Sequence, residues 1–101
     1  MDYQKHTTSN GIKFELSGTF TFADHQIFKT ILEHVDEAGI HQIELDMAAV
    51  TFIDSAALGM LLLLRDRCQS THTPIIISRA QGQTEKVMRI SKFDQLFTLR
   101  S

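Results

Sequence analysis

Residues 43–61 read IELDMAAVTFIDSAALGML, and this stretch decides the fold. It opens with apolar side chains that alternate with acidic ones, the period-two pattern of a half-buried β-strand. A second apolar run leads to Asp54 and Ser55, and an apolar pattern at helical spacing follows them. Short polar side chains in front of such a pattern are typical of a helix N-terminus. The stretch therefore predicts a strand over 41–47, a connection through Asp54-Ser55, and a helix that ends near Gln69.

The rest of the chain carries strand and helix patterns on both sides of this stretch. Asp24 is expected to be the N-cap of a first helix that stops at Gly39. The β-branched run Ile75–Ile77 is typical of an interior strand that is covered on both faces. This order of elements predicts an α/β fold, a mixed β-sheet with helices packed on it, in one small domain over residues 1–101. The other expected elements are a strand up to His6, a turn at Asn10-Gly11, a strand over Ile12–Leu16, a helix over Glu85–Ser91 and a strand over Leu96–Leu99.

Composition and charge narrow the range of functions. The 101 residues are 43% hydrophobic and 22% charged, which is ordinary for a globular protein. Ten basic and twelve acidic side chains give a net charge of −2, so we expect neither nucleic acid nor a membrane surface as a partner. The N-terminus has no apolar core of a signal peptide, and no apolar run reaches the length of a membrane span. Together with a single cysteine, these features predict a cytoplasmic protein.

The helix after Ser55 is apolar on more than one side. Its expected core face consists of Ala57, Leu58, Leu61, Leu64 and Cys68. A second group lies on or beside the azimuth of Ser55, where a solvent-facing helix normally carries charged residues, and it indicates a surface that binds another protein. Two simpler explanations remain open at this point: Asp54 and Ser55 suit an ordinary helix cap, and an apolar flank suits contact with a neighbouring helix. The members of this second group are Gly59, Met60, Leu62, Leu63 and Asp66.

These residues resemble the signature of the STAS domain, the family of bacterial anti-sigma-factor antagonists and their relatives. The resemblance rests on the strand Ile43–Asp46, the approach Val50–Ile53, the Asp54-Ser55 pair and Leu58-Gly59 in the helix. It extends to the order of elements over most of the chain, and the segment Phe93–Phe97 is similar to the usual ending of the family. Many members have a second hydroxyl residue and a glycine after the phosphorylated position, whereas this chain has Ala56-Ala57.

The resemblance implies a switch operated by phosphorylation. In the family, the serine or threonine after this aspartate is phosphorylated by a partner kinase, which in many systems is also the anti-sigma factor. Here that position is Ser55, and Asp54 is expected to cap the helix in front of it. The implied partners are an anti-sigma factor or serine kinase, bound when Ser55 is unmodified and released when it carries phosphate, and a serine phosphatase. No cofactor and no metal are implied.

Three other functions compete with this one. A STAS subunit of a larger assembly, such as a lipid-transport ABC complex, would share the fold without phosphorylation at Ser55. A response-regulator receiver would need acidic residues at the ends of adjacent strands to bind Mg²⁺, and only Asp46 stands in such a place. An enzyme is not expected, because Ser55 lacks a Gly-x-Ser-x-Gly setting and the five histidines show no metal-binding spacing.

Overall fold

The computed structural model describes residues 1–37 and 39–101. They form a five-stranded sheet with the strand order β1-β2-β3-β4-β5, together with three α-helices and two short 3₁₀ turns. The elements in chain order are β1 (Asp2–Thr7), β2 (Gly11–Phe20), η1 (Phe22–Asp24), α1 (His25–Val35), β3 (Gln42–Ile53), α2 (Ser55–Gln69), β4 (Ile75–Ser78), α3 (Gly82–Ile90), η2 (Phe93–Gln95) and β5 (Thr98–Arg100).

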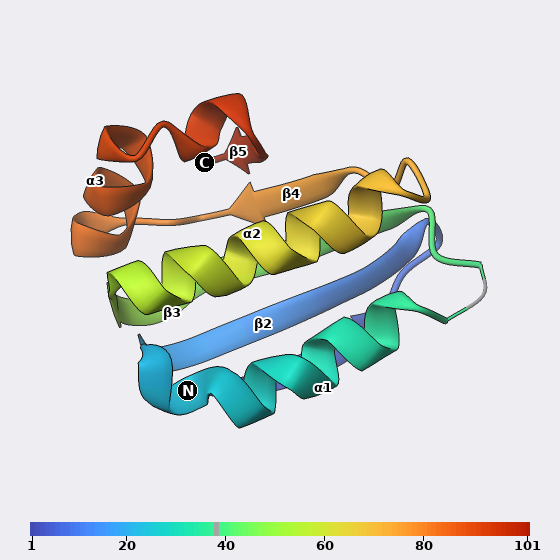
Figure 1. The fold of residues 1–101 in the computed structure, drawn as a ribbon, viewed down its shortest axis with the longest axis horizontal. Helices are drawn as coiled ribbons and strands as arrows, with labels where there is room; N and C mark the ends of the chain where they lie inside the picture. The colour runs from blue at the N-terminus through green and yellow to red at the C-terminus, as the bar shows by residue number, and fades with distance from the viewer. Residues whose placement is uncertain (38) are drawn as a thin grey trace.

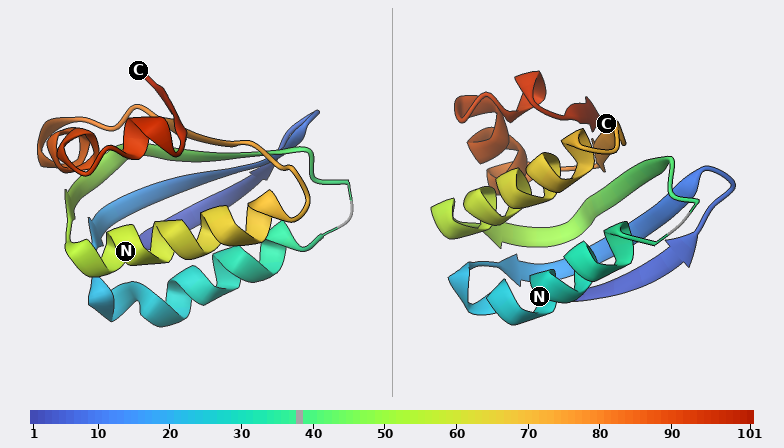
Figure 2. Two further views of the ribbon diagram at one scale, coloured as in Figure 1. Left: turned by 45° about the horizontal axis from the view of Figure 1, so that its top comes forward. Right: turned by 45° about the vertical axis from the view of Figure 1, so that its right-hand side comes forward.

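The sheet is mixed. Strands β1 and β2 form an antiparallel hairpin, while β2, β3, β4 and β5 are parallel to one another. Each parallel pair is connected by a crossover that contains a helix, as parallel strands require. Helices α1 and α2 lie side by side on one face of the sheet, and α3 lies beyond the end of β4 (Figures 1 and 2). The predicted α/β fold with a mixed sheet is confirmed.

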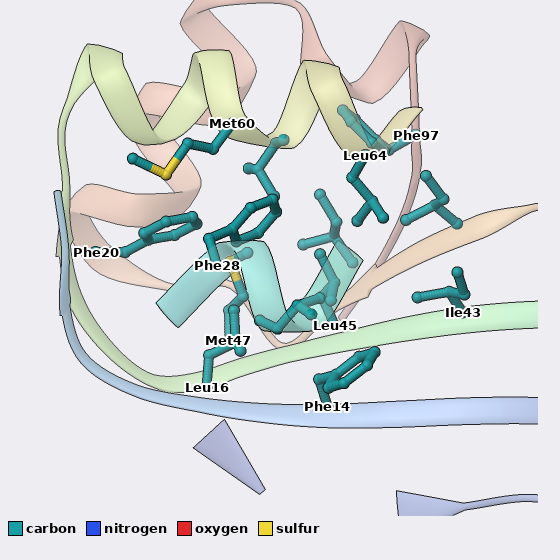
Figure 3. Packing of buried hydrophobic residues seen from close by; sticks show 14 of the residues in the cluster. Phe14, Leu16, Phe20, Phe28, Ile43, Leu45, Met47, Met60, Leu64 and Phe97 are labelled. Atoms are coloured by element: carbon teal, nitrogen blue, oxygen red, sulfur yellow. The ribbon is translucent and has the colours of Figure 1, made fainter. Parts of the chain in front are cut away.

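The core lies between the sheet and the helices α1 and α2 (Figure 3). The alternating apolar residues of β2 and β3 all point toward these helices, and each is at most 2% exposed. Burial of such large apolar side chains is the main favourable contribution to folding. The period-two predictions for both strands are therefore confirmed. The side chains concerned are Ile12, Phe14 and Leu16 of β2, and Ile43, Leu45 and Met47 of β3.

Strand β3 is longer than the sequence pattern predicts. The expected strand ended at Met47, but the observed one runs to Ile53. The reason is its pairing with β2, which continues up to Phe20 and Ile53 across two irregularities in the register. The expected connection at Val50–Ile53 is thus part of the strand. As a result, β3 carries the chain directly to Asp54 and the start of α2.

Asp24 occupies the N-cap position of α1, as predicted, but its side chain does not cap that helix. The chain leaves β2 through the 3₁₀ turn η1, and Thr21 is the N-cap of that turn. The Asp24 carboxylate accepts a hydrogen bond from the backbone N–H of Thr21 over 2.8 Å, which closes a capping box. It makes no side-chain hydrogen bond to the start of α1. Asp24 therefore fixes the turn in front of the helix.

The ends of the last two elements also differ from the predictions. Helix α3 begins at Gly82, three residues before the expected start, and β5 begins at Thr98. The segment Phe93–Gln95 forms η2, and Phe93 and Phe97 pack together with their ring centroids 5.3 Å apart. All four residues of β4 are buried, as expected for an interior strand.

Candidate functional site

Ser55 is the first residue of α2, and it is exposed. Asp54 before it has an extended backbone, with φ −109° and ψ 177°, which is the usual conformation of an N-cap. Its carboxylate oxygen Oδ1 accepts a hydrogen bond from the backbone N–H of Ala57 over 2.8 Å. Asp54 is thus the N-cap residue, and Ser55 is exposed at the N-terminus of the helix.

The Asp54 residue also connects α2 to the turn after β2. Its second carboxylate oxygen accepts a hydrogen bond from the backbone N–H of Phe22 over 3.2 Å. Its own N–H donates to the carbonyl oxygen of Phe20 over 3.3 Å. Residues 20–22 therefore lie directly beside the start of α2, although they are distant in sequence.

This contact brings Phe22, an aromatic residue that the sequence analysis missed, to the turn beside the start of α2. Phe22 is 73% exposed, the highest value among the large apolar residues described. A phenylalanine within a polar turn is a signal in the sequence, because turns rarely need a large apolar residue. Its relation to Ser55, however, depends on the hydrogen bond to Asp54 and is visible only in the folded chain.

The outward side of α2 is apolar where it continues from Ser55. Leu62 is 38% exposed and Leu63 is 57% exposed, and Gly59 and Asp66 are exposed as well. Residues three and four apart on a helix lie next to one another, so Ser55, Gly59, Leu62 and Asp66 form one continuous stripe. We call the set Phe22, Ser55, Gly59, Leu62, Leu63 and Asp66 the Ser55 surface.

Met60 does not belong to this surface, and its expected exposure was wrong. It is 6% exposed and points from α2 into the cluster that contains Phe20 and Phe28 (Figure 3). The reason is that α1 packs on this side of α2, so that Met60 lies at the base of a groove of about 400 Å³ between the two helices. Leu63, one turn further out, lines the same groove and remains accessible.

The predicted core face of α2 is confirmed at four of its five residues. Ala57, Leu61, Leu64 and Cys68 are at most 1% exposed, in agreement with the prediction. Leu58, the fifth residue predicted there, is only partly buried and packs against the edge of the core. Met60, which was not predicted on this face, is buried instead of Leu58. A neighbouring helix, which the sequence left open as an explanation for Met60, accounts for the difference.

Gln83 of α3 is a second residue that the sequence analysis missed. Its side-chain oxygen accepts a hydrogen bond from the N–H of Ile53, and its side-chain nitrogen donates to the carbonyl of Ile53, both over 3.0 Å. The residue that precedes Asp54 is therefore held by α3. Gln83 lies before the expected helix Glu85–Ser91, and nothing in the local pattern links it to a residue 30 positions earlier.

The chemistry of the site follows from the helix N-terminus. The first backbone N–H groups of a helix have no partner within it and carry a partial positive charge, so an anion on Ser55 would be stabilised there.

Within the described residues, no group of three or more His, Cys, Asp and Glu side chains is arranged to hold a metal ion. Among the helices described, none has the length and apolar character needed to cross a membrane.

Comparison with known proteins places this geometry in a family. The STAS domain family model matches residues 3–101. A STAS-domain containing protein of Pseudomonas aeruginosa (strain UCBPP-PA14) is 34% identical over 88 residues, which cover 87% of this chain and 86% of that protein.

Solved structures show the same fold. The anti-sigma factor antagonist SpoIIAA of Bacillus in its unphosphorylated form has a TM-score of 0.83 at 17% identity, covering 99% of this chain and 89% of that one. A sulfate transporter family protein from Wolinella succinogenes has a TM-score of 0.77 at 20% identity, covering 95% and 80% of the two chains. The match over residues 3–101 and the shared fold mean that this chain belongs to the STAS domain family.

Proposed function

We propose that this protein is a cytoplasmic anti-sigma factor antagonist, a binding protein without enzymatic activity that phosphorylation of Ser55 switches off. The observation that carries the proposal is the exposed position of Ser55 at the start of α2, on a helix whose outward side continues to the accessible side chains of Leu62 and Leu63. The turn with the exposed Phe22 lies beside the same helix start. A protein that docks on these apolar side chains must come close to the Ser55 hydroxyl. Asp54 caps the helix, so the hydroxyl is free for a kinase.

Phosphorylation at this position is compatible with the fold. The phosphate group would lie at the N-terminus of a 15-residue helix, where the helix dipole favours an anion by about 0.3–1 kcal/mol. Because Ser55 is exposed, the added group displaces no buried side chain. The modified protein therefore keeps its structure, and the effect of the phosphate is confined to what the Ser55 surface can bind.

The phosphate group then acts on the partner. It adds roughly 1.5 to 2 negative charges at the start of α2, at one end of the surface that continues to Leu62 and Leu63 and that a partner would otherwise cover. Burying an anion without a matching cation costs several kcal/mol, and about 1.4 kcal/mol already corresponds to a tenfold change in affinity. Release by two to three orders of magnitude follows from these values.

The partners that fit this scheme are an anti-sigma factor or serine kinase, which binds the unmodified form, and a serine phosphatase that restores it. Support comes from SpoIIAA, the fold relative named above, which has been solved in both an unphosphorylated and a phosphorylated form.

One observation favours a second candidate function. The same fold occurs in a sulfate transporter family protein, which supports a role of this chain within a transport assembly. In that case the Ser55 surface would be a permanent contact within a larger assembly, such as a lipid-transport ABC complex, and Ser55 would not be phosphorylated.

A binding experiment with three variants tests the proposal. The Ser55→Ala variant should capture the partner in a pull-down from cell lysate and should not accept phosphate from ATP. Ser55→Asp should release the same partner. Ser9→Asp is the matched control, because Ser9 is exposed in the β1–β2 hairpin at the opposite end of the sheet, and it should bind like the wild type. Equal binding by Ser55→Asp and wild type would refute the charge-operated release.

Phosphorylation itself is measured separately. Wild-type protein incubated with ATP and lysate should gain one phosphate on the peptide that contains Ser55, as seen by mass spectrometry. A stable complex that survives in both Ser55 variants, without any phosphate on that peptide, would support the assembly subunit instead.

A further inference from the structure

Within residues 1–37 and 39–101, no strand pairs with the second half of β3 on the side of β4. Pairing between these strands ends at Asp46 and Ser78, whereas β3 continues to Ile53. After β4 the chain turns into α3, which packs beside this part of β3 (Figure 1). Backbone groups of β3 that point toward α3 need partners, because unpaired backbone groups away from water are costly.

Side chains at the start of α3 supply these partners. The side-chain nitrogen of Gln81 donates to the carbonyl of Ala48 over 2.7 Å, and the Thr84 hydroxyl lies 3.5 Å from the carbonyl of Val50. Gln83 pairs with both backbone groups of Ile53. The beginning of α3 thus replaces the missing strand with a row of side-chain hydrogen bonds.

Gln83 differs from Gln81 and Thr84 in two ways: it makes two hydrogen bonds to β3, and it makes them next to Asp54 and Ser55. Both hydrogen bonds measure 3.0 Å, so the Gln83 amide group pairs with Ile53 as a neighbouring strand would. Ile53 is followed directly by Asp54 and Ser55. On the other side of β3, the N–H of Asp54 donates to Phe20 of β2. The turn that presents Ser55 is therefore held from two sides, and Gln83 is the contact on the α3 side.

We infer that Gln83 is a positioning residue for Ser55: through Ile53 it holds the turn in the conformation that a kinase and a binding partner recognise. The functional part of this inference rests on the function proposed above. Without Gln83, the N–H and carbonyl of Ile53 would lose their protein partners, and the Asp54-Ser55 turn would populate further conformations. A partner that recognises only one of these conformations then binds more weakly: its apparent Kd equals the intrinsic Kd divided by the fraction of molecules in that conformation.

This mechanism has a kinetic signature. A smaller competent fraction raises the KM for phosphorylation of Ser55 and the Kd for the partner by the same factor, while kcat is unchanged. A general loss of stability would leave both constants unchanged as long as the protein is folded. We expect an increase of about threefold to tenfold in each constant, equivalent to a competent fraction of about one third to one tenth.

The experiment compares Gln83→Met with Gln81→Met in the full chain. Methionine has nearly the length of glutamine and a similar helix propensity, but it makes no comparable hydrogen bond. Gln81→Met is the matched control, because it removes a contact of the same row to Ala48, farther from Ser55. Backbone ¹⁵N order parameters of Ile53, Asp54 and Ser55 report on the turn without any partner.

We expect these order parameters to fall from about 0.85 to below about 0.7 in Gln83→Met and to stay unchanged in Gln81→Met. KM and Kd should rise together in Gln83→Met only. Unchanged order parameters, or a mobile turn with unchanged KM and Kd, would overturn the inference. If Gln83→Met does not fold, Gln83→Glu, which keeps the acceptor for the Ile53 N–H, replaces it. If wild type accepts no phosphate and binds no partner, the proposed function fails, and the order parameters still decide whether Gln83 holds the turn.

Discussion

The carboxylate of Asp54 accepts a hydrogen bond over 3.2 Å from the backbone N–H of Phe22, a residue 32 positions earlier in the chain. The same carboxylate caps α2 through Ala57. One side chain therefore fixes both the helix that begins with Ser55 and the turn that carries the most exposed phenylalanine. The position of Phe22 in the Ser55 surface depends on Asp54.

We predict that Asp54→Ala lowers the free energy of unfolding by about 1–3 kcal/mol, because it removes the helix cap and the hydrogen bond to Phe22. Asp54→Asn keeps an oxygen that can accept from Ala57, so its loss should be smaller. Urea unfolding followed by circular dichroism measures both values. An Asp54→Ala variant as stable as wild type would show that the cap contributes nothing to α2.

Met60 and Leu63 offer a direct test of where the surface of α2 begins. Met60 is 6% exposed and Leu63 is 57% exposed. We expect Met60→Gln to cost about 2–4 kcal/mol of stability, since it buries an amide in an apolar cluster. Leu63→Gln should change stability by no more than about 0.5 kcal/mol.

Partner binding should show the opposite contrast for Leu63. Because a docking protein would cover this side chain, Leu63→Gln should weaken the complex by about tenfold or more in a titration with the purified partner. Lys86→Gln on α3, an exposed residue outside the Ser55 surface, serves as the control and should bind normally. Normal binding by Leu63→Gln would remove Leu63 from the proposed interface.

Most of the sheet and the position of Ser55 could be predicted from the sequence, because both depend on local patterns. The alternation around Phe14 and Leu45 has the period of a strand, and Asp54-Ser55 precedes an apolar helical pattern. The extension of β3 could not be predicted in this way. Ala48 and Ala49 interrupt the alternation, and the strand is continued there by pairing with β2.

The remaining errors concern contacts between distant segments. A helical wheel gives the azimuth of Met60 but not the helix that covers it, and α1 decides its burial. Gln83 and Phe22 gain their roles through hydrogen bonds to residues 30 and 32 positions away. Side chains that act over such separations leave no period and no local motif in a single sequence.

Asp46 should make stability depend on pH. Its side chain is 3% exposed, and burial alone would raise its pKa, but hydrogen bonds from Arg79 and from the N–H of Ala48, with Lys13 nearby, hold the pKa below its ordinary value. A carboxyl group with a lowered pKa in the folded state stabilises the protein above its unfolded value of about 4. This contribution is lost as the pH falls through the folded value.

We therefore expect Asp46→Asn to be less stable than wild type by about 1–2 kcal/mol near pH 7, a moderate value because the Arg79 side chain is 59% exposed. The two proteins should approach each other in stability as the pH falls through the lowered folded-state pKa of Asp46, because the carboxyl group is then protonated. Urea midpoints across this range measure the difference. A gap that stays constant with pH would mean that Asp46 does not ionise differently in the folded and unfolded states.

Cys68 should be unreactive in the folded protein. It is 1% exposed on the core face of α2, and burial raises the pKa of its thiol to about 11, an effect that Arg67 opposes only in part. Since the thiolate is the reactive form, alkylation by iodoacetamide near pH 8 should be slow until the protein unfolds. Mass spectrometry with and without urea measures the difference. Rapid labelling without urea would indicate that α2 opens easily.

A substitution at Gly59 should affect stability and partner binding in opposite directions. Apart from its chain neighbours and the adjacent backbone of α2, a Cβ atom at this position would meet no described atom within 4 Å, and the residue lies inside α2 on the same stripe as Ser55. Alanine has the higher helix propensity, so Gly59→Ala should stabilise the free protein by about 0.8–1 kcal/mol in urea unfolding. The fold itself thus gives no reason for a glycine here.

If the partner lies close to this stripe, the methyl group added by Gly59→Ala obstructs the contact, and we expect the more stable variant to bind more weakly. A Gly59→Ala protein that is more stable and binds as tightly as wild type would place the partner elsewhere on the Ser55 surface.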